Sequence, residues 1–168
     1  MFSLEGQTIK IKSFNPRAEQ HGAEKVPAAD IGIELAAPNY MLSEFGQQLR
    51  DSLYWNSGEQ PNQGELIEPA VDKPNLRTPE LKGPFKLNTE IVGADVTIDW
   101  GIGGKSNIEL GDCEVNNFSV DPKEGGTVEI SFRIQCHPSE SDAGKLCGLV
   151  QQEAKMTLSP PSVEAPAL

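Results

Sequence analysis

Residues Gly101 to Ser106 read GIGGKS, and a Lys-Ser pair after glycines is the pattern with which a phosphate-binding loop holds a nucleotide. Two features of the surrounding sequence argue against that chemistry. The first glycine of the motif would fall at Asp99, whose carboxylate would repel phosphate. The motif is also followed by a predicted strand, NIEL, instead of a helix whose N-terminus could bind an anion. We therefore interpret the segment as a hairpin turn whose glycines supply positive φ angles.

Cysteines and histidines are the next candidates for chemistry. Cys113, Cys136, His137 and Cys147 could supply the four ligands of a zinc ion, but the close CxxC pair of most structural zinc sites is missing. Cys136 continues the alternation of the apolar residues before it, so we expect a buried free thiol there and a packing role for Cys147. Neither His21 nor His137 belongs to a spaced catalytic motif. The sequence therefore predicts no catalytic residue, no metal site and no cofactor.

Carboxylates occupy outward positions on the predicted central strands. Asp95 and Asp99 alternate with apolar residues on one strand, and Glu109 and Glu129 have the same outward parity on its neighbours. Three interpretations remain open: a solvated face, a surface that docks on a basic partner, and a catalytic carboxylate pair or calcium site. No loop has the DxDxDG spacing of calcium ligands. We take these four carboxylates as the candidate partner-binding face.

The charge of the chain is strongly negative and unevenly distributed. The net charge of -11, from 25 acidic and 14 basic residues, opposes contact with phosphate backbones on most faces. Residues 89–130 carry nine acids and only two lysines, whereas residues 1–37 are nearly balanced. A nucleic acid would therefore have to use the N-terminal cations. The alternative set of contacts consists of Lys10, Lys12, Arg17 and Lys25.

Length and cysteine content indicate the class and the compartment. A chain of 168 residues can bury a core as one domain without disulfides or metal. Three cysteines, an odd number without framework spacing, favour a reducing compartment. The N-terminus lacks the basic start and apolar stretch of a signal peptide, and no apolar run approaches the roughly 20 residues that span a bilayer. We expect a soluble, cytoplasmic protein that does not bind membranes.

Alternating apolar residues predict a sheet of antiparallel strands. Strands are expected at residues 7–13, 28–36, 84–91, 94–100, 107–110, 128–136 and 152–159. The strands at 84–91 and 94–100 should form a hairpin within a central sheet of four strands, with Trp100 in the core. Gly111 interrupts the alternation as a β-bulge does, and the pair Gly125 and Gly126 suits a hairpin turn.

Two short helices are expected beside this sheet. The first should span residues 40–54, with Asn39 as its N-cap and Gly46 as a weak point in its middle. Its apolar stripe consists of Leu42, Phe45, Leu49 and Leu53. The second helix should begin at Ser139.

The remaining segments are expected to lack regular structure. Residues 15–27 should form a polar loop, and residues 55–84 a long irregular connection. Residues 159–168 should be a disordered C-terminal tail, which leaves residues 1–158 as a single β-rich domain. The fold class predicted from these elements is α+β, mainly β, with an antiparallel sheet or β-sandwich and two short helices.

Five runs of the chain resemble an uncharacterised family of small proteins encoded by tailed phages and prophages. They are TIKIKSFNPRAEQHG, VPAADI, PNLRTPEL, DWGIGGKSNIELGDCEV and DPKEGGTVEISFRIQ. The resemblance extends over nearly the whole chain, but it supplies no catalytic or binding residues. It implies a phage origin and expression in the cytoplasm of an infected bacterium.

Two functions follow as expectations. In the first, the chain is a non-catalytic phage accessory protein whose acidic face binds a host protein with a basic surface. That partner would be a bacterial defence or nucleic-acid-processing complex, which the chain would inhibit by covering its groove. In the alternative, the chain assists phage recombination or replication by binding single-stranded DNA or a recombinase through its N-terminal cations.

Overall fold

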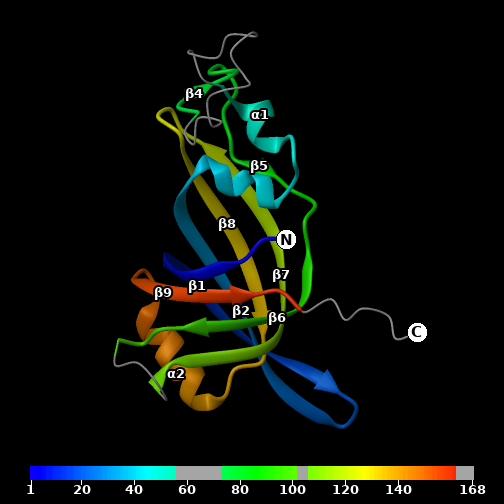
Figure 1. The fold of residues 1–168 in the computed structure, drawn as a ribbon. Coiled ribbons are helices and arrows are strands. Elements are labelled where there is room, and N and C mark those ends of the chain that lie inside the picture. The colour runs from blue at the N-terminus through cyan, green and yellow to red at the C-terminus, as the bar shows by residue number, and fades with distance from the viewer. Residues whose placement is uncertain (56–72, 102–105, 162–168) are drawn as a thin grey trace, which may run out of the picture.

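The protein is described by a computed structural model in residues 1–55, 73–101 and 106–161 (Figure 1). Its elements are β1 (Leu4–His21), β2 (Glu24–Pro38), the 3-10 helix η1 (Asn39–Glu44), α1 (Leu49–Leu53), β3 (Tyr54–Trp55), β4 (Asn75–Leu76), β5 (Phe85–Lys86), β6 (Ile91–Ile98), β7 (Ile108–Pro122), β8 (Thr127–Cys136), α2 (Glu140–Leu149) and β9 (Glu153–Ser159). Strands dominate, and the helices are short. The predicted class, α+β and mainly β, is therefore confirmed.

The main sheet closes on itself. β1 pairs with β2, β2 with β8, β8 with β7, β7 with β6, β6 with β9, and β9 with β1 again, and every pair is antiparallel. β5 adds a seventh strand beside β7, and β3 and β4 form a separate small sheet. The expectation of four central strands is wrong because it omitted β1, β2 and β9, which complete the ring. Closure leaves the body of the barrel without an open edge.

Inward-facing side chains fill the barrel. The alternation is most regular in β8, where five inward residues are buried: Val128, Ile130, Phe132, Ile134 and Cys136. The ring of Phe2 lies with its centroid 5.0 Å from that of Phe45 and 5.3 Å from that of Phe118. Such aromatic pairs contribute about 0.5–1.5 kcal/mol each beyond their buried area. The interior is a packed apolar core.

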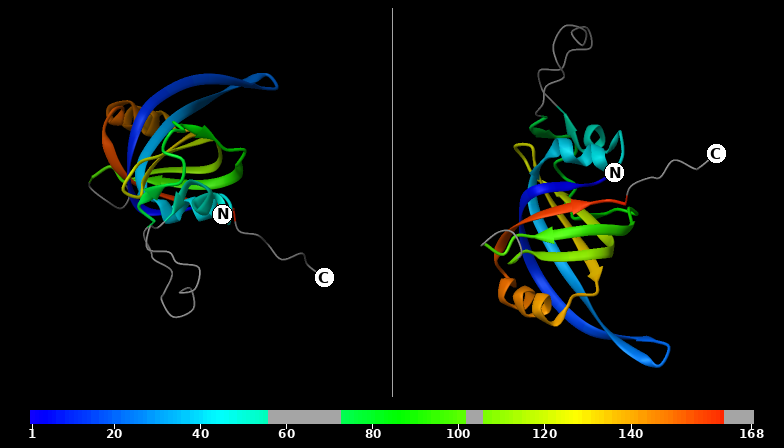
Figure 2. Two further views of the ribbon diagram at one scale, coloured as in Figure 1. Left: turned by 90° about the horizontal axis from the view of Figure 1, so that it is seen from above. Right: turned by 60° about the horizontal axis from the view of Figure 1, so that its bottom comes forward.

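The segment at residues 15–27, expected to be a loop, is a β-hairpin. β1 and β2 pair from Lys10 with Glu34 to His21 with Glu24, and Gly22 turns between them at a φ of 66°. The pairing of β2 with β8 ends at Ala29, so the hairpin projects beyond the barrel (Figures 1 and 2). We call residues 16–28 the hairpin arm. Most side chains of the arm are exposed, so its strands carry no apolar alternation by which the sequence could identify them.

The expected helix at 40–54 is wrong as a continuous element. η1 ends at Glu44 and α1 begins at Leu49, with a turn around Gly46 between them. Asn39 is buried and does not act as an N-cap. Its side-chain nitrogen donates to the backbone carbonyl of Lys73 at 2.7 Å, and its side-chain oxygen accepts from the Arg50 guanidinium at 2.8 Å. The break between η1 and α1 lets Arg50 of α1 reach back to Asn39 at the start of η1. In one straight helix these two residues would be too far apart for this contact.

The expected hairpin of 84–91 with 94–100 is also wrong. β5 is only two residues long and pairs with β7, and β6 lies between β7 and β9. Trp100 lies beyond the end of β6 and is 40% exposed, with the Lys145 ammonium 5.4 Å from the centre of its ring. The hairpin turn expected at Gly101–Ser106 includes residues 102–105, which lie outside the described residues.

Several local predictions are confirmed. The register between β6 and β7 shifts where Ala94 pairs with Cys113 and Val96 with Leu110, so β7 bulges at Gly111. Gly125 and Gly126 turn between β7 and β8 with φ angles of 97° and 93°. The Ser139 hydroxyl caps α2 by accepting from the Asp142 amide at 3.1 Å. β9 ends at Ser159, and residues 162–168 of the expected tail lie outside the described part of the chain.

Tyr54 ties the segment after α1 to the turn between β7 and β8. Its hydroxyl accepts from the Lys123 amide at 2.8 Å and lies 2.9 Å from the carbonyl oxygens of Lys123 and Thr127, one of which receives its proton. The side chain is fully buried, and this burial raises the pKa of Tyr54 to about 12. The hydroxyl is therefore a neutral donor over the whole physiological range.

Tyr54→Phe should lower the free energy of unfolding by about 1–2 kcal/mol, because the buried turn carbonyls lose a donor. Urea denaturation followed by circular dichroism measures the effect. The matched control is Tyr40→Phe, since Tyr40 is 51% exposed. Equal stabilities of the two variants would contradict the role assigned to the Tyr54 hydroxyl.

Candidate protein-binding surface

The outer face of β6 and β7 carries the first part of the predicted acidic set. Asp95 is exposed on β6, and Glu109 of β7 is directly opposite Thr97, two residues further along β6. Asp99 follows β6, where one carboxylate oxygen accepts from the Gly101 amide at 2.9 Å. The inward neighbours of these residues, Val96 and Ile98, are buried in the core, so the strand must direct the carboxylates outward.

The bulge in β7 adds two carboxylates that the sequence did not single out. Asp112 takes a φ of 51° in the bulge, and Glu114 is opposite Val92. A Cβ atom on Gly111 would lie 3.6 Å from a carboxylate oxygen of Asp95, and one on Gly93 would lie 3.7 Å from one of Asp112, so both carboxylates lie along the surface of these strands. The bulge predicted at Gly111 could have identified these two carboxylates. The extra residue in β7 changes which of the following side chains point outward, and Asp112 and Glu114 then lie on the outer face.

We call Asp95, Glu109, Asp112 and Glu114 the acidic ridge. The ion pairs within the described part of the chain include none of these four carboxylates. Val92 beside the ridge is 68% exposed. The ridge thus presents uncompensated negative charge next to an exposed aliphatic side chain, a combination suited to contact with a protein.

Glu129 belongs to a different surface. It lies on β8, opposite Asp121 of β7 and Ala36 of β2, whereas Glu109 lies at the other end of β7. Lys123 contacts both acids there, at 2.8 Å from Asp121 and 4.0 Å from Glu129. The structure therefore brings Asp95, Asp99 and Glu109 together and separates Glu129 from them.

The predicted cationic set does not form one patch. Arg17 pairs with Asp30 at 3.3 Å and also with Glu19, and Lys12 pairs with Glu34 at 3.3 Å. Lys10 is half-buried, and Lys25 is exposed near the tip of the hairpin arm. Two of the four cations are thus neutralised by neighbouring carboxylates, which reduces the attraction that a phosphate backbone would feel.

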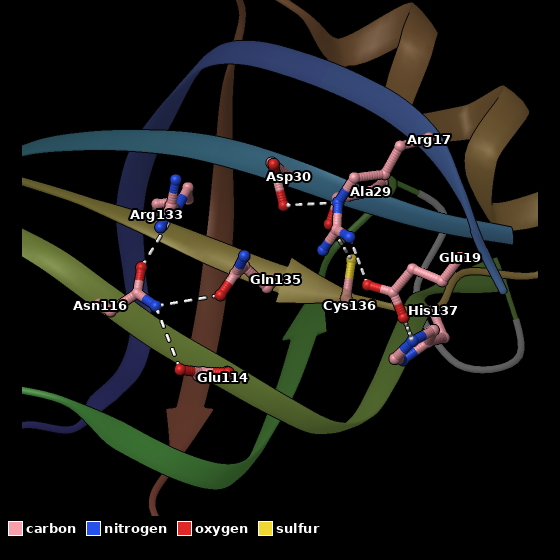
Figure 3. Close-up of polar contacts among 10 residues, drawn as sticks. All are labelled: Arg17, Glu19, Ala29, Asp30, Glu114, Asn116, Arg133, Gln135, Cys136 and His137. Atoms are coloured by element: carbon pink, nitrogen blue, oxygen red, sulfur yellow. Dashed lines mark hydrogen bonds and ion pairs between the residues drawn. The ribbon is translucent and has the colours of Figure 1, made fainter. Parts of the chain in front are cut away.

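A polar groove of about 460 Å³ crosses the outside of β1, β2, β8 and β7. Small residues form part of its floor, and a Cβ on Gly32 would come within 2.5 Å of the Ser13 hydroxyl. Arg133, one of its lining residues, donates to Asn116 at 3.1 Å, and Asn116 in turn donates to Gln135 at 3.0 Å (Figure 3). The only sequence signal for this groove was a glycine inside a strand.

A second hollow, of about 380 Å³, lies between the hairpin arm and the end of the β7–β8 ladder. His137 lies at its edge with its Nε2 atom 2.9 Å from a carboxylate oxygen of Glu19, which also contacts Arg17 (Figure 3). Cys113 of β7 and Cys136 at the end of β8 also line this hollow, and both are buried. Burial raises the pKa of both thiols to about 12. They are therefore protonated at neutral pH.

The third cysteine differs from the expectation. Cys147 is exposed on α2 because the inward side of that short helix is provided by Leu146, so its predicted packing role is wrong. Within the described ranges, no three cysteine, histidine or carboxylate side chains are placed to share a metal ion. None of the helices in that part of the chain is long and apolar enough to cross a membrane.

Comparisons with protein-family models, curated proteins and solved structures found no match to this chain. The function must therefore be inferred from the residues themselves.

The buried thiols should react slowly. In the native protein at pH 8, we expect iodoacetamide to label Cys113 and Cys136 at least about a hundredfold more slowly than Cys147, because the reactive thiolate is rare when the pKa is near 12. Their rates should rise with pH, since the thiolate fraction grows as pH approaches that value. Timed labelling with peptide mass spectrometry measures all three sites. Labelling in urea is the control, and comparable native rates would contradict the burial of the two thiols.

Proposed function

We propose that this chain is a non-catalytic binding protein whose acidic ridge docks on a basic surface of a partner protein. The observation that carries the proposal is the ridge itself: four carboxylates on adjacent strands without an ion pair in the described structure. Strands of a closed barrel hold them in a fixed arrangement. A preformed charged surface loses little conformational entropy when it binds.

The chemistry of the two hollows supports binding over catalysis. The carboxylates of the groove are matched with nearby cations, as in the pairs of Lys12 with Glu34 and Arg17 with Asp30. The thiols of the second hollow are buried, and their pKa near 12 makes them poor nucleophiles at neutral pH. The histidine at its edge, His137, has its Nε2 atom bound to a carboxylate oxygen of Glu19 at 2.9 Å.

The charge of the whole chain supports the same proposal. A net charge of -11 accelerates encounter with a basic partner, and an unpaired ridge gives that encounter a preferred orientation. Proteins that process nucleic acids have basic grooves, because those grooves must hold phosphates. With the resemblance to small phage and prophage proteins, this leads us to propose a bacterial defence or nucleic-acid-processing complex as the partner, inhibited when the ridge occupies its groove.

The alternative, an accessory of recombination or replication, has weaker support. Lys12 and Arg17 are engaged with carboxylates, and Lys25 stands apart from them near the tip of the arm. Binding of single-stranded DNA would require those ion pairs to open. A recombinase that is contacted through its own basic groove would remain compatible with the acidic ridge.

Reversal of charge on the ridge should strongly weaken capture of the partner. The immobilised double variant Asp95→Lys/Glu109→Lys should bind a protein captured by the wild type from a bacterial lysate at least about tenfold more weakly, because two attractive contacts become repulsive. Quantitative mass spectrometry of the eluates measures this. The wild-type interaction should also weaken between 50 mM and 500 mM salt, since exposed charges are screened.

The matched control is Glu5→Lys/Glu24→Lys, which makes the same change in net charge at exposed acids outside the ridge. This variant should retain the partner. Loss of capture in both variants would mean that net charge alone is responsible. Retention by the ridge variant would exclude the ridge as the docking surface.

A labelled single-stranded oligonucleotide should not be retarded by the protein at 50 mM salt, because Lys12 and Arg17 are paired with carboxylates and the net charge of the chain is -11. A gel-shift titration tests this expectation. A shift that weakens as salt rises, and that is lost in Lys12→Glu/Lys25→Glu, would instead support the DNA-binding alternative.

A further inference from the structure

The register of β7 and β8 places two cysteines near each other at the end of their ladder. The ladder pairs Val115 with Ile134 and ends with Glu114 opposite Gln135, and one further step in the same register would oppose Cys113 to Cys136. Both cysteines have the buried parity, with 0% and 1% of their surface exposed. Directly opposed residues of antiparallel strands have Cβ atoms about 4.5–5.5 Å apart, and a disulfide requires about 3.5–4.5 Å. A small approach of the two strands would therefore allow a bond.

The cysteine pair also lies where the strands can move. β8 ends at Cys136, and β7 bulges at Gly111 and Asp112, directly before Cys113. Strand ends open locally at lower free energy than the centre of a sheet. Both cysteines line the hollow of about 380 Å³ beside the hairpin arm, so opening of the ladder end would give a small oxidant a route to the thiols.

We propose that Cys113 and Cys136 form a reversible disulfide that joins β7 to β8 at the floor of this hollow. The oxidant is a small disulfide such as oxidised glutathione. One cysteine thiolate attacks a sulfur of the oxidant, forms a mixed disulfide and releases one glutathione thiolate. The second cysteine then displaces the other glutathione. The two thiol protons pass to the two released thiolates, so two cysteines are oxidised and one glutathione disulfide is reduced to two thiols.

The surroundings of the pair make the reaction slow. Burial holds both thiols in the protonated form, and the carboxylates of Asp95 and Asp112 add to the effect at Cys113. Attack therefore depends on transient opening of the ladder end. The disulfide would respond to sustained oxidation, and it is independent of the docking proposed for the acidic ridge.

The test uses the full chain with Cys147→Ser, because the exposed third thiol would otherwise form adducts or link two molecules. The protein is equilibrated in glutathione buffers of increasing oxidised-to-reduced ratio, quenched with acid and alkylated in denaturant. We expect a species that has lost two hydrogens and takes up no alkylating agent. A proteolytic digest should contain the peptide of Cys113 linked to that of Cys136, and dithiothreitol should restore both thiols.

The same titration in urea distinguishes a native geometry from chance collision. If the fold opposes the two thiols, the equilibrium constant for forming the disulfide should be at least about tenfold larger in the native protein than in the unfolded chain, because native disulfides stabilise folds by this order or more. The oxidised protein should then unfold at a higher temperature than the reduced one. Two free thiols at every ratio, a stable mixed disulfide with glutathione, or an equal constant in urea would each overturn the proposal.

Discussion

Hydrogen bonding between β7 and β8 closes the sheet, and the core, the acidic ridge and the cysteine pair all depend on this closure. β7 pairs with β6 on one side and with β8 on the other, and β8 pairs in turn with β2. A strand held on both edges cannot shift by one residue without moving its buried side chains to the solvent side. The outward carboxylates of β7 are therefore fixed by the same register that buries Val115 and Val120.

The distribution of ion pairs explains why one acidic surface differs from the others. Cations lie next to the carboxylates of β1, β2 and the β7–β8 turn, in the pairs of Lys12 with Glu34, Arg17 with Asp30 and Lys123 with Asp121. Exposed pairs of this kind contribute little to stability, but they reduce the local field. The ridge on β6 and β7 has no such neutralising pair in the described part of the chain. Its negative field is therefore not compensated by a neighbouring cation.

The hairpin arm extends the fold beyond the barrel without adding to the core. Its two strands pair only with each other past Ala29, and Glu19 on the arm contacts His137 after β8. This contact joins the arm to the barrel above the second hollow (Figure 3). Arg17 and Glu19 of the arm thus line the same hollow as Cys113 and Cys136.

The sequence by itself determined the features that depend on neighbouring residues: the inward faces of β6, β8 and β9, the bulge at Gly111, the cap at Ser139 and the outward direction of Asp95 and Glu109. Which strands pair depends on contacts between residues that are distant in the sequence. Closure of the barrel, the break near Gly46, the separation of Glu129 from the ridge and the proximity of Cys113 and Cys136 all follow from contacts between distant residues. A period of two shows which face of a strand is buried. It does not show which strand lies beside it, because that choice depends on how the whole core packs.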